Sequence, residues 1–143
     1  MPRFLSPVVA FAVVLLGLAA FGCSHLDTSA PGSADRVVTG EITAGGEEAL
    51  PSPSEVWVRV LDLAHGEARP EVLGEQTIAN PGHLPVSYRV EFRAEDAQLR
   101  QNICIDVRVS VGRQVRYYTV SRQPLTPGNI AEPVTVRVVP AQP

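Results

Sequence analysis

A strict alternation of apolar and polar residues runs through residues 103–111, ICIDVRVSV. The apolar positions are all β-branched: Ile103, Ile105, Val107, Val109 and Val111. Successive side chains of a β-strand point to opposite faces, so this period of two indicates a strand with one face toward a core. We predict that the Ile and Val side chains face the core, and that the other face carries Cys104, Asp106, Arg108 and Ser110.

Other short runs rich in β-branched and aromatic residues lie between Pro- and Gly-containing turns. They cover residues 37–43, 55–63, 71–78, 86–92, 115–120 and 134–139. This spacing is typical of an all-β sandwich, and no stretch of this region has a helical period. The fold class we predict is all-β, a single seven-stranded antiparallel β-sandwich over residues 36–143, with residues 94–102 as a connector of at most one helical turn.

Gly112 marks a chain reversal between the strands at 103–111 and 115–120. A three-residue connection would place Val115, Tyr117 and Thr119 opposite the apolar positions of the first strand. Arg116 and Tyr118 would then share the outer face with Arg108.

Trp57 belongs to the outward phase of its strand, together with Arg59 and Leu61. Three explanations remain open: the strand is covered on both faces, it contains a bulge near Leu61 and Asp62, or Trp57 marks a partner surface. We therefore predict a partner surface formed by Trp57, Arg108, Arg116 and Tyr118. The alternative is an ordinary solvated sheet on which Arg and Tyr side chains stack on each other.

Cys104 and Cys23 are the only two cysteines of the chain. Cys104 lies on the polar face of its strand by strict alternation, although a bulge near the strand start would turn it inward. We expect a buried or half-buried unpaired thiol, because an exposed one is a liability in an oxidising compartment.

The composition argues against several functional classes. The formal net charge is -3, so we expect no nucleic-acid partner. His25, His65 and His83 have no second ligand at a metal-site spacing, and no nucleophile elbow or phosphate-binding loop is present. We predict no catalytic, metal-binding or cofactor-binding residues, no cofactor and no enzymatic activity; a hydrolase site assembled from distant loops is the alternative.

The N-terminus has the pattern of an export signal. Arg3 is followed by an apolar stretch from Val8 to Phe21, which is shorter than the roughly 20 residues that a membrane-spanning helix needs. Residues 20–23, AFGC, resemble a bacterial lipobox, in which the cysteine is lipidated and becomes the new N-terminus. We predict a lipoprotein signal peptide over 1–22, lipidation at Cys23, and a lipidated Cys and flexible Ser-, Ala-, Gly- and Pro-rich tether over 23–35.

The lipid on Cys23 would attach the protein to a membrane, and Ser24 at the next position favours the outer membrane, with the domain facing the periplasm. Two alternatives remain. Ordinary signal cleavage after Gly22 would release a soluble periplasmic protein, and a disulfide between Cys23 and Cys104 would fold the tail back onto the domain.

The order of these segments resembles the YbaY/YscW family of bacterial lipoproteins. The resemblance is carried by the segments VVTGEI (37–42), EEALPSPSEVWVRVLDLA (47–64), EVLGEQTI (71–78), LPVSYRVEF (84–92), ICIDVRVSVGRQVRYYTV (103–120) and PLTPG (124–128). It implies a secreted β-sandwich, in which Asp62 has a structural role and accepts hydrogen bonds from nearby backbone amides.

The family resemblance implies two functions. The first expectation is a non-enzymatic outer-membrane lipoprotein of YbaY type, a tethered β-sandwich that binds an envelope component as an accessory module. The alternative is a YscW-like pilotin, which binds a secretin subunit and aids its outer-membrane assembly in type III secretion. A pilotin needs a groove or a sheet edge for the secretin's C-terminal segment.

Overall fold

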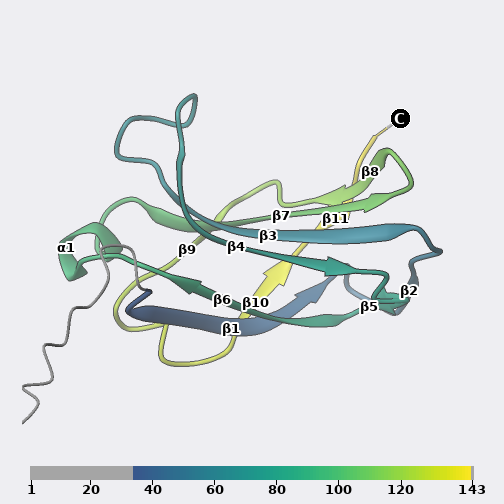
Figure 1. Ribbon diagram of the computed structural model, residues 1–143, viewed down its shortest axis with the longest axis horizontal. Helices are drawn as coiled ribbons and strands as arrows, with labels where there is room; N and C mark the ends of the chain where they lie inside the picture. Colours follow the sequence, from purple (N-terminus) through teal and green to yellow (C-terminus); the bar gives the residue numbers. More distant parts are fainter. Residues whose placement is uncertain (1–33, 143) are drawn as a thin grey trace, which may run out of the picture. The chain divides into compact units, whose positions relative to one another are not determined.

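The computed structural model describes residues 34–142, and the predicted signal peptide, Cys23 and nearly all of the predicted tether lie outside this range (Figure 1). The described elements are β1 (Arg36–Thr43), β2 (Glu48–Ala49), β3 (Ser54–Asp62), β4 (Glu71–Ala79), β5 (His83–Leu84), β6 (Val86–Phe92), α1 (Asp96–Leu99), β7 (Ile103–Val111), β8 (Gln114–Tyr118), β9 (Gln123–Pro124), β10 (Val134–Arg137) and β11 (Val139–Pro140). The all-β prediction is confirmed.

The seven predicted strands correspond to the seven described strands of four or more residues, namely β1, β3, β4, β6, β7, β8 and β10. They divide between two sheets. One has the order β11-β8-β7-β3-β4, with β9 also paired to β7, and the other has the order β10-β1-β6. The separate pair β2-β5 joins two loops.

One pairing differs from the antiparallel prediction. β1 and β10 run parallel, with Gly40 opposite Val134 and Thr43 opposite Arg137. A tight hairpin forces its strands to be antiparallel, but these two strands are separated by most of the domain and no hairpin connects them. Their direction therefore follows from the tertiary arrangement.

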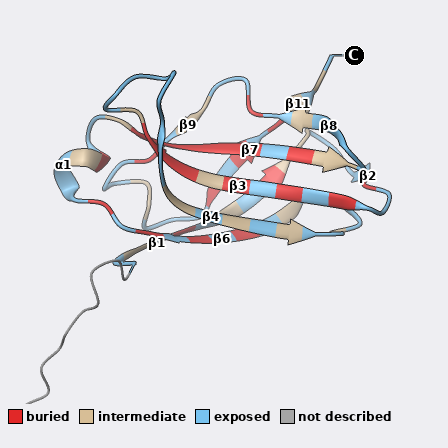
Figure 2. Cartoon of the chain, turned by 45° about the horizontal axis from the view of Figure 1, so that its top comes forward, coloured by how far each residue is buried: buried red, intermediate tan, exposed pale blue. Residues whose placement is uncertain are grey.

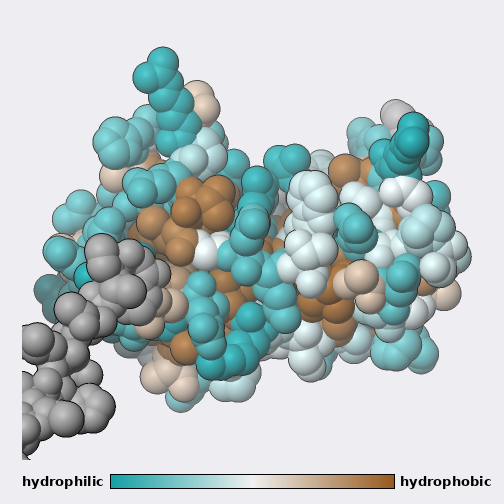
Figure 3. All heavy atoms as spheres, viewed as in Figure 1, coloured by the Kyte–Doolittle hydropathy of each residue, from teal (hydrophilic) through white to brown (hydrophobic). Residues whose placement is uncertain are grey.

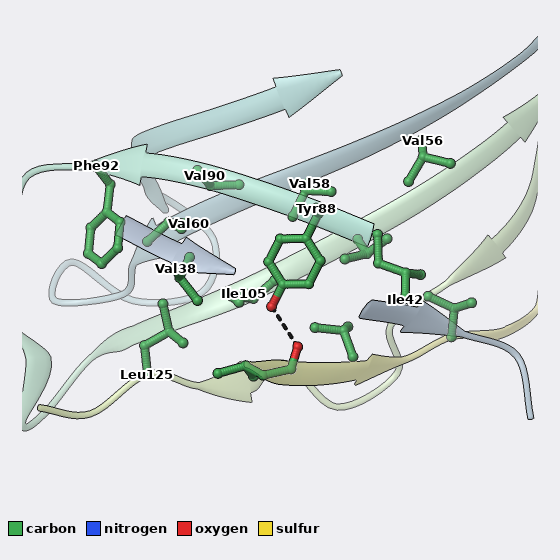
Figure 4. Close-up of a cluster of buried hydrophobic side chains, with 14 of the residues drawn as sticks. Val38, Ile42, Val56, Val58, Val60, Tyr88, Val90, Phe92, Ile105 and Leu125 are labelled. Carbon is green, nitrogen blue, oxygen red and sulfur yellow. Dashed lines mark hydrogen bonds between the residues drawn. The ribbon is translucent and has the colours of Figure 1, made fainter. Parts of the chain in front are cut away.

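The core lies between the two sheets. Figure 2 shows buried and more exposed residues alternating along β3 as far as Val60. In β7 the first five residues are all buried, and Arg108 is the one exposed residue. Val58 of β3 and Ile105 of β7 face Val38 of β1 and Val90 of β6 across the interior (Figure 4). The predicted inward set on β7 is confirmed, with Val111 only half-buried at the strand end.

The connector before β7 contains the single helical turn α1. The Glu95 amide donates a 2.9 Å hydrogen bond to Gln98 Oε1, as in a capping box. Gln98 Nε2 in turn donates to Asp62 Oδ2 at 3.2 Å, and Asp62 Oδ1 accepts the Ala64 amide at 2.8 Å. The structural role expected for Asp62 is confirmed.

Candidate functional site

The outer face of the larger sheet brings together three of the four residues predicted as a partner surface. Trp57 of β3 lies opposite Arg108 of β7, and Tyr118 of β8 lies opposite Arg108 on its other side. Directly opposed residues on one face of a sheet are cross-strand neighbours. We call Trp57, Arg108 and Tyr118 the aromatic row.

Arg116 does not fall in register with the aromatic row. The β7–β8 connection is a two-residue loop, Gly112–Arg113, because Gln114 already pairs with Val111. Gly112 has a φ of +62°, as a tight hairpin turn with glycine at its first position requires. The register then shifts, so Val115 lies opposite Ser110 and Arg116 is the extra residue before Tyr117. The predicted three-residue connection, and Val115 opposite an apolar position, are therefore wrong.

The aromatic row is accessible. Trp57 is 47% exposed and Tyr118 is 38% exposed, and the neighbouring Val115 and Val120 are also exposed. These four are among the six exposed large hydrophobic residues of the described range, the others being Val37 and Val72. Trp57 Nε1 donates a 3.2 Å hydrogen bond to Glu55 Oε2, which orients the indole on the sheet.

The structure shows which of the explanations left open for the outer face of β3 apply, and at which end of the strand. The β3–β4 register shifts between Val60 and Leu61, but the extra residue there is Leu73 on β4, and the β3–β7 register runs without a break from Ser54 to Asp62. β3 itself therefore has no bulge near Leu61 and Asp62. Leu61 is buried although it belongs to the outward phase, and Asp62, in the inward phase, is buried as well, so this end of β3 is covered on both faces. At the other end Trp57 is open to solvent, and a partner surface remains its predicted role.

A hollow lies beside the aromatic row, and its lining includes Glu67, Cys104, Asp106, Arg108, Thr119 and Arg122. We call it the arginine hollow. In the space-filling view this side of the domain is concave, between the projecting loop after β3 and the β7–β8 hairpin (Figure 3). The lining combines these charged and polar groups with the apolar side chains of Leu63, Ile103 and Val120.

Asp106 is the centre of the charged contacts in the hollow, and its side chain is only 8% exposed. Arg59 Nη2 donates to Asp106 Oδ2 at 2.6 Å, and the Thr119 hydroxyl donates to Asp106 Oδ1 at 3.0 Å. Thr119 Oγ1 also accepts the Val107 amide at 3.2 Å. This buried carboxylate is therefore well satisfied and fixes the chain segment after β8 against β7.

Cys104 lies deeper in the same hollow and is buried, as expected for an unpaired thiol. No bulge turns it inward: it keeps its outward register, opposite Leu61 and Pro124, and the overlying chain covers it. Burial raises the pKa of the Cys104 thiol; Arg122 lowers it, and the carboxylates of Asp106, Glu67 and Asp62 raise it further. The thiol therefore stays protonated at neutral pH.

Sequence reasoning did not select Asp106, Arg59, Thr119 or Arg122 as site residues. The outward phase of β7 and β3 gave a partial signal, since Asp106 and Arg59 occupy polar positions of both strands. Their pairing depends on the β3–β7 register, which puts Arg59 opposite Asp106. Sequence alternation alone does not determine that register.

Within residues 34–142, no group of three or more His, Cys, Asp or Glu side chains could hold a metal ion. No helix in that same range is long and apolar enough to cross a membrane. His65 and His83 are exposed in loops or at a strand edge, and His25 lies outside the described residues.

Two of three comparisons relate this chain to known proteins. A search of curated proteins found no match. Among solved structures, the chain is similar to an alternative pilotin from the type II secretion system of Vibrio cholerae. The TM-score is 0.62 at 17% identity, and the alignment covers 76% of this chain and 98% of the pilotin, which shows a shared fold.

The comparison with family models shows the family of the chain as well as its fold. The model of the family described as type III secretion system lipoprotein chaperone (YscW) matches residues 33–138, which is nearly the whole described domain. A chaperone role of this kind is not enzymatic. The chain belongs to the YscW family of type III secretion lipoprotein chaperones.

Proposed function

We propose that this protein is a pilotin, a non-enzymatic lipoprotein that binds a secretin subunit and aids its assembly in the outer membrane. The observation that carries the proposal is the YscW family match over residues 33–138. The similarity in fold to a pilotin of another secretion system supports it. The comparisons thus favour the pilotin alternative over the YbaY-type accessory role, for which they give no support.

The anchor in this proposal is a lipid on Cys23, with the signal peptide removed and the domain held on the periplasmic side of the outer membrane. The lipobox-like AFGC segment and Ser24 support this placement. A single acyl chain gives marginal membrane binding, whereas the two or more chains of a bacterial lipoprotein give stable attachment. A bound secretin would then be carried to the membrane in which it assembles.

The aromatic row is our proposed contact surface for the secretin's C-terminal segment. Trp, Tyr and Arg are the residues most enriched among the energetic centres of protein interfaces. Here all three stand on adjacent strands of one sheet, so their positions are fixed before binding and little conformational entropy is lost.

The sheet edges favour docking on this face over addition of a strand. The β4 edge is partly occupied by β6, since the Arg89 amide donates a 2.8 Å hydrogen bond to Gln76 Oε1. A Cβ at Gly74 would overlap the Glu91 backbone, so the two strands cross closely. At the opposite edge β11 has only two residues. Short or covered edges are poor templates for a new strand.

The direct test is binding of the full chain to the C-terminal segment of a type III secretion secretin. We expect the wild-type protein to bind. Trp57→Ala combined with Tyr118→Ala should weaken binding by about tenfold or more, because these truncations remove the aromatic side chains that the bound segment would bury. Val37→Ala and Val72→Ala remove exposed apolar groups elsewhere and serve as matched controls. Wild type that binds no secretin segment would contradict the pilotin proposal.

The anchor has a separate test. Mass spectrometry of the mature N-terminus should find an acylated Cys23, and Cys23→Ser should move the protein from the membrane to the soluble fraction. In the same strain, less secretin should reach the outer membrane. An unmodified Cys23, or unchanged fractionation of the variant, would contradict the lipid anchor without affecting the binding proposal.

A further inference from the structure

Two arginines of the hollow have unused hydrogen-bonding capacity. Arg108 Nε lies 3.8 Å from Asp106 Oδ2, and Arg122 Nε lies 3.9 Å from Asp106 Oδ1. Both distances are longer than a hydrogen bond allows. Among residues 34–142, neither guanidinium donates a hydrogen bond to another residue. Asp106 is already satisfied by Arg59 and Thr119 at 2.6 and 3.0 Å.

From this geometry we propose that Arg108 and Arg122 form a binding site for a carboxylate of the partner's peptide segment, next to the aromatic row. This proposal rests on the proposed function and specifies its partner chemistry: an apolar segment that carries an Asp or Glu side chain. Arginine presents its donors in a fixed planar fork that suits a carboxylate.

The charge balance of the hollow supports an anionic ligand. Three arginines, Arg59, Arg108 and Arg122, surround the buried Asp106 carboxylate. The only other carboxylate in contact with them among the described residues is Glu67, 3.7 Å from Arg122 Nη1, and its side chain is 82% exposed. Such a loose, solvated pair is worth little, so an incoming carboxylate can replace it at low cost.

The apolar part of the ligand follows from what borders the two arginines. Tyr118 lies beside Arg108 in the row and also lines the hollow, as does the exposed Val120. Trp57 lies on the other side of Arg108. A segment that places one acidic side chain in the hollow would therefore lay its apolar side chains on Tyr118, Val120 and Trp57.

A peptide fits this site better than an anionic lipid surface. Arg122 is recessed, with 28% of its side chain exposed, and the Glu67 carboxylate projects at the rim. Glu55 and Glu75 are exposed on the same sheet. A flat layer of phosphates would meet these carboxylates before it reached Arg122, whereas one side chain on a narrow segment can reach past them.

The test uses the single tryptophan of the chain as its reporter, since Trp57 stands in the row itself. Full chain is titrated with the secretin C-terminal peptide, with the same peptide carrying Asn and Gln for Asp and Glu, and with a synthetic Leu- and Glu-containing peptide beside its Gln counterpart. Vesicles containing phosphatidylglycerol form a further arm. The variants are Arg108→Gln, Arg122→Gln and the double variant, with Arg89→Gln on the other sheet as control.

We expect the acidic peptides to bind about tenfold more tightly than their amide counterparts, with the difference abolished in the double variant and unchanged in Arg89→Gln. Equal binding of secretin peptide and amide peptide would overturn the carboxylate site but leave the pilotin proposal intact. If no secretin peptide binds, the Leu- and Glu-containing pair decides: a Trp57 response that needs both arginines supports the site, and none overturns it. A response to vesicles alone would assign the arginines to lipid and overturn the proposal.

Discussion

The phenolic hydroxyl of Tyr88 donates a 2.8 Å hydrogen bond to the backbone carbonyl of Val134, across a strand that lies between them (Figure 4). Tyr88 of β6 and Val134 of β10 both lie opposite Gly40 of β1. Because Gly40 has no side chain, the ring can cross above it and reach the last long strand. This hydrogen bond therefore joins β6 to β10 and holds β10 beside β1 in the parallel pair.

Replacing Tyr88 by Phe should destabilise the domain by about 1–2 kcal/mol, because the change removes one buried hydrogen bond and leaves a carbonyl less well satisfied. Urea unfolding followed by circular dichroism measures the effect. Tyr118→Phe is the matched control, since the Tyr118 hydroxyl makes no hydrogen bond to another described residue. Equal midpoints for the two variants would contradict the role assigned to Tyr88.

Gly40→Ala should cost about 3 kcal/mol, because the new Cβ would overlap the Val134 carbonyl oxygen and force β10 away from β1. Gly46 has no heavy atom within 4 Å of the equivalent position, so Gly46→Ala should change stability by less than about 0.5 kcal/mol. Thermal unfolding of both variants tests this. A Gly40→Ala protein with wild-type stability would be inconsistent with the close approach of the two strands.

Asp106→Asn should destabilise the domain by about 2 kcal/mol, since it removes the charge that balances the half-buried Arg59 and two further arginines. Asp96→Asn makes the same chemical change in an exposed ion pair with Arg36, where about 0.5 kcal/mol is expected. Chemical denaturation of the two variants compares them. Similar losses in the free energy of unfolding at both positions would show that Asp106 contributes no more to stability than an exposed carboxylate.

Stability should fall as pH rises above the ordinary thiol pKa of about 8.5, because burial raises the pKa of Cys104 in the folded state. The unfolded chain then ionises first, so the contribution of the protonated thiol is present below that pH and is lost above it. Urea titrations between about pH 7 and pH 9.5 should show a smaller decline for Cys104→Ala than for wild type. Identical slopes would indicate an accessible thiol.

The local sequence was a good guide to the strands. The alternation in residues 103–111 reproduces β7 from its first residue to its last, and the helical turn at 96–99 falls inside the predicted connector. The strand could be predicted because the period of two in its side chains shows which residues share a face. The short strands β2, β5 and β9 were not predicted, because a two-residue ladder has no period to detect. The strand predicted at 134–139 covers both β10 and the first residue of β11.

The candidate site was only partly predictable for a related reason. Trp57, Arg108 and Tyr118 were expected on an outer face, and the β3–β7–β8 register sets them side by side. Arg116 was misplaced, because the two-residue loop at Gly112 and the following irregularity changed which residues oppose β7. Loop length and register decide such neighbours, and several loops fit the same sequence pattern.

The sequence by itself determined the all-β class, the approximate extent of the long strands and the inward face of β7, because these follow from side-chain alternation between neighbours in the chain. Only the tertiary structure decided that β10 lies parallel to β1, that Tyr88 reaches Val134 over Gly40, and that Cys104 is covered without a bulge. It also gathered Arg59, Arg108 and Arg122 around Asp106. Each of these contacts joins residues far apart in the chain, and the packing of two sheets on one core fixes them all together.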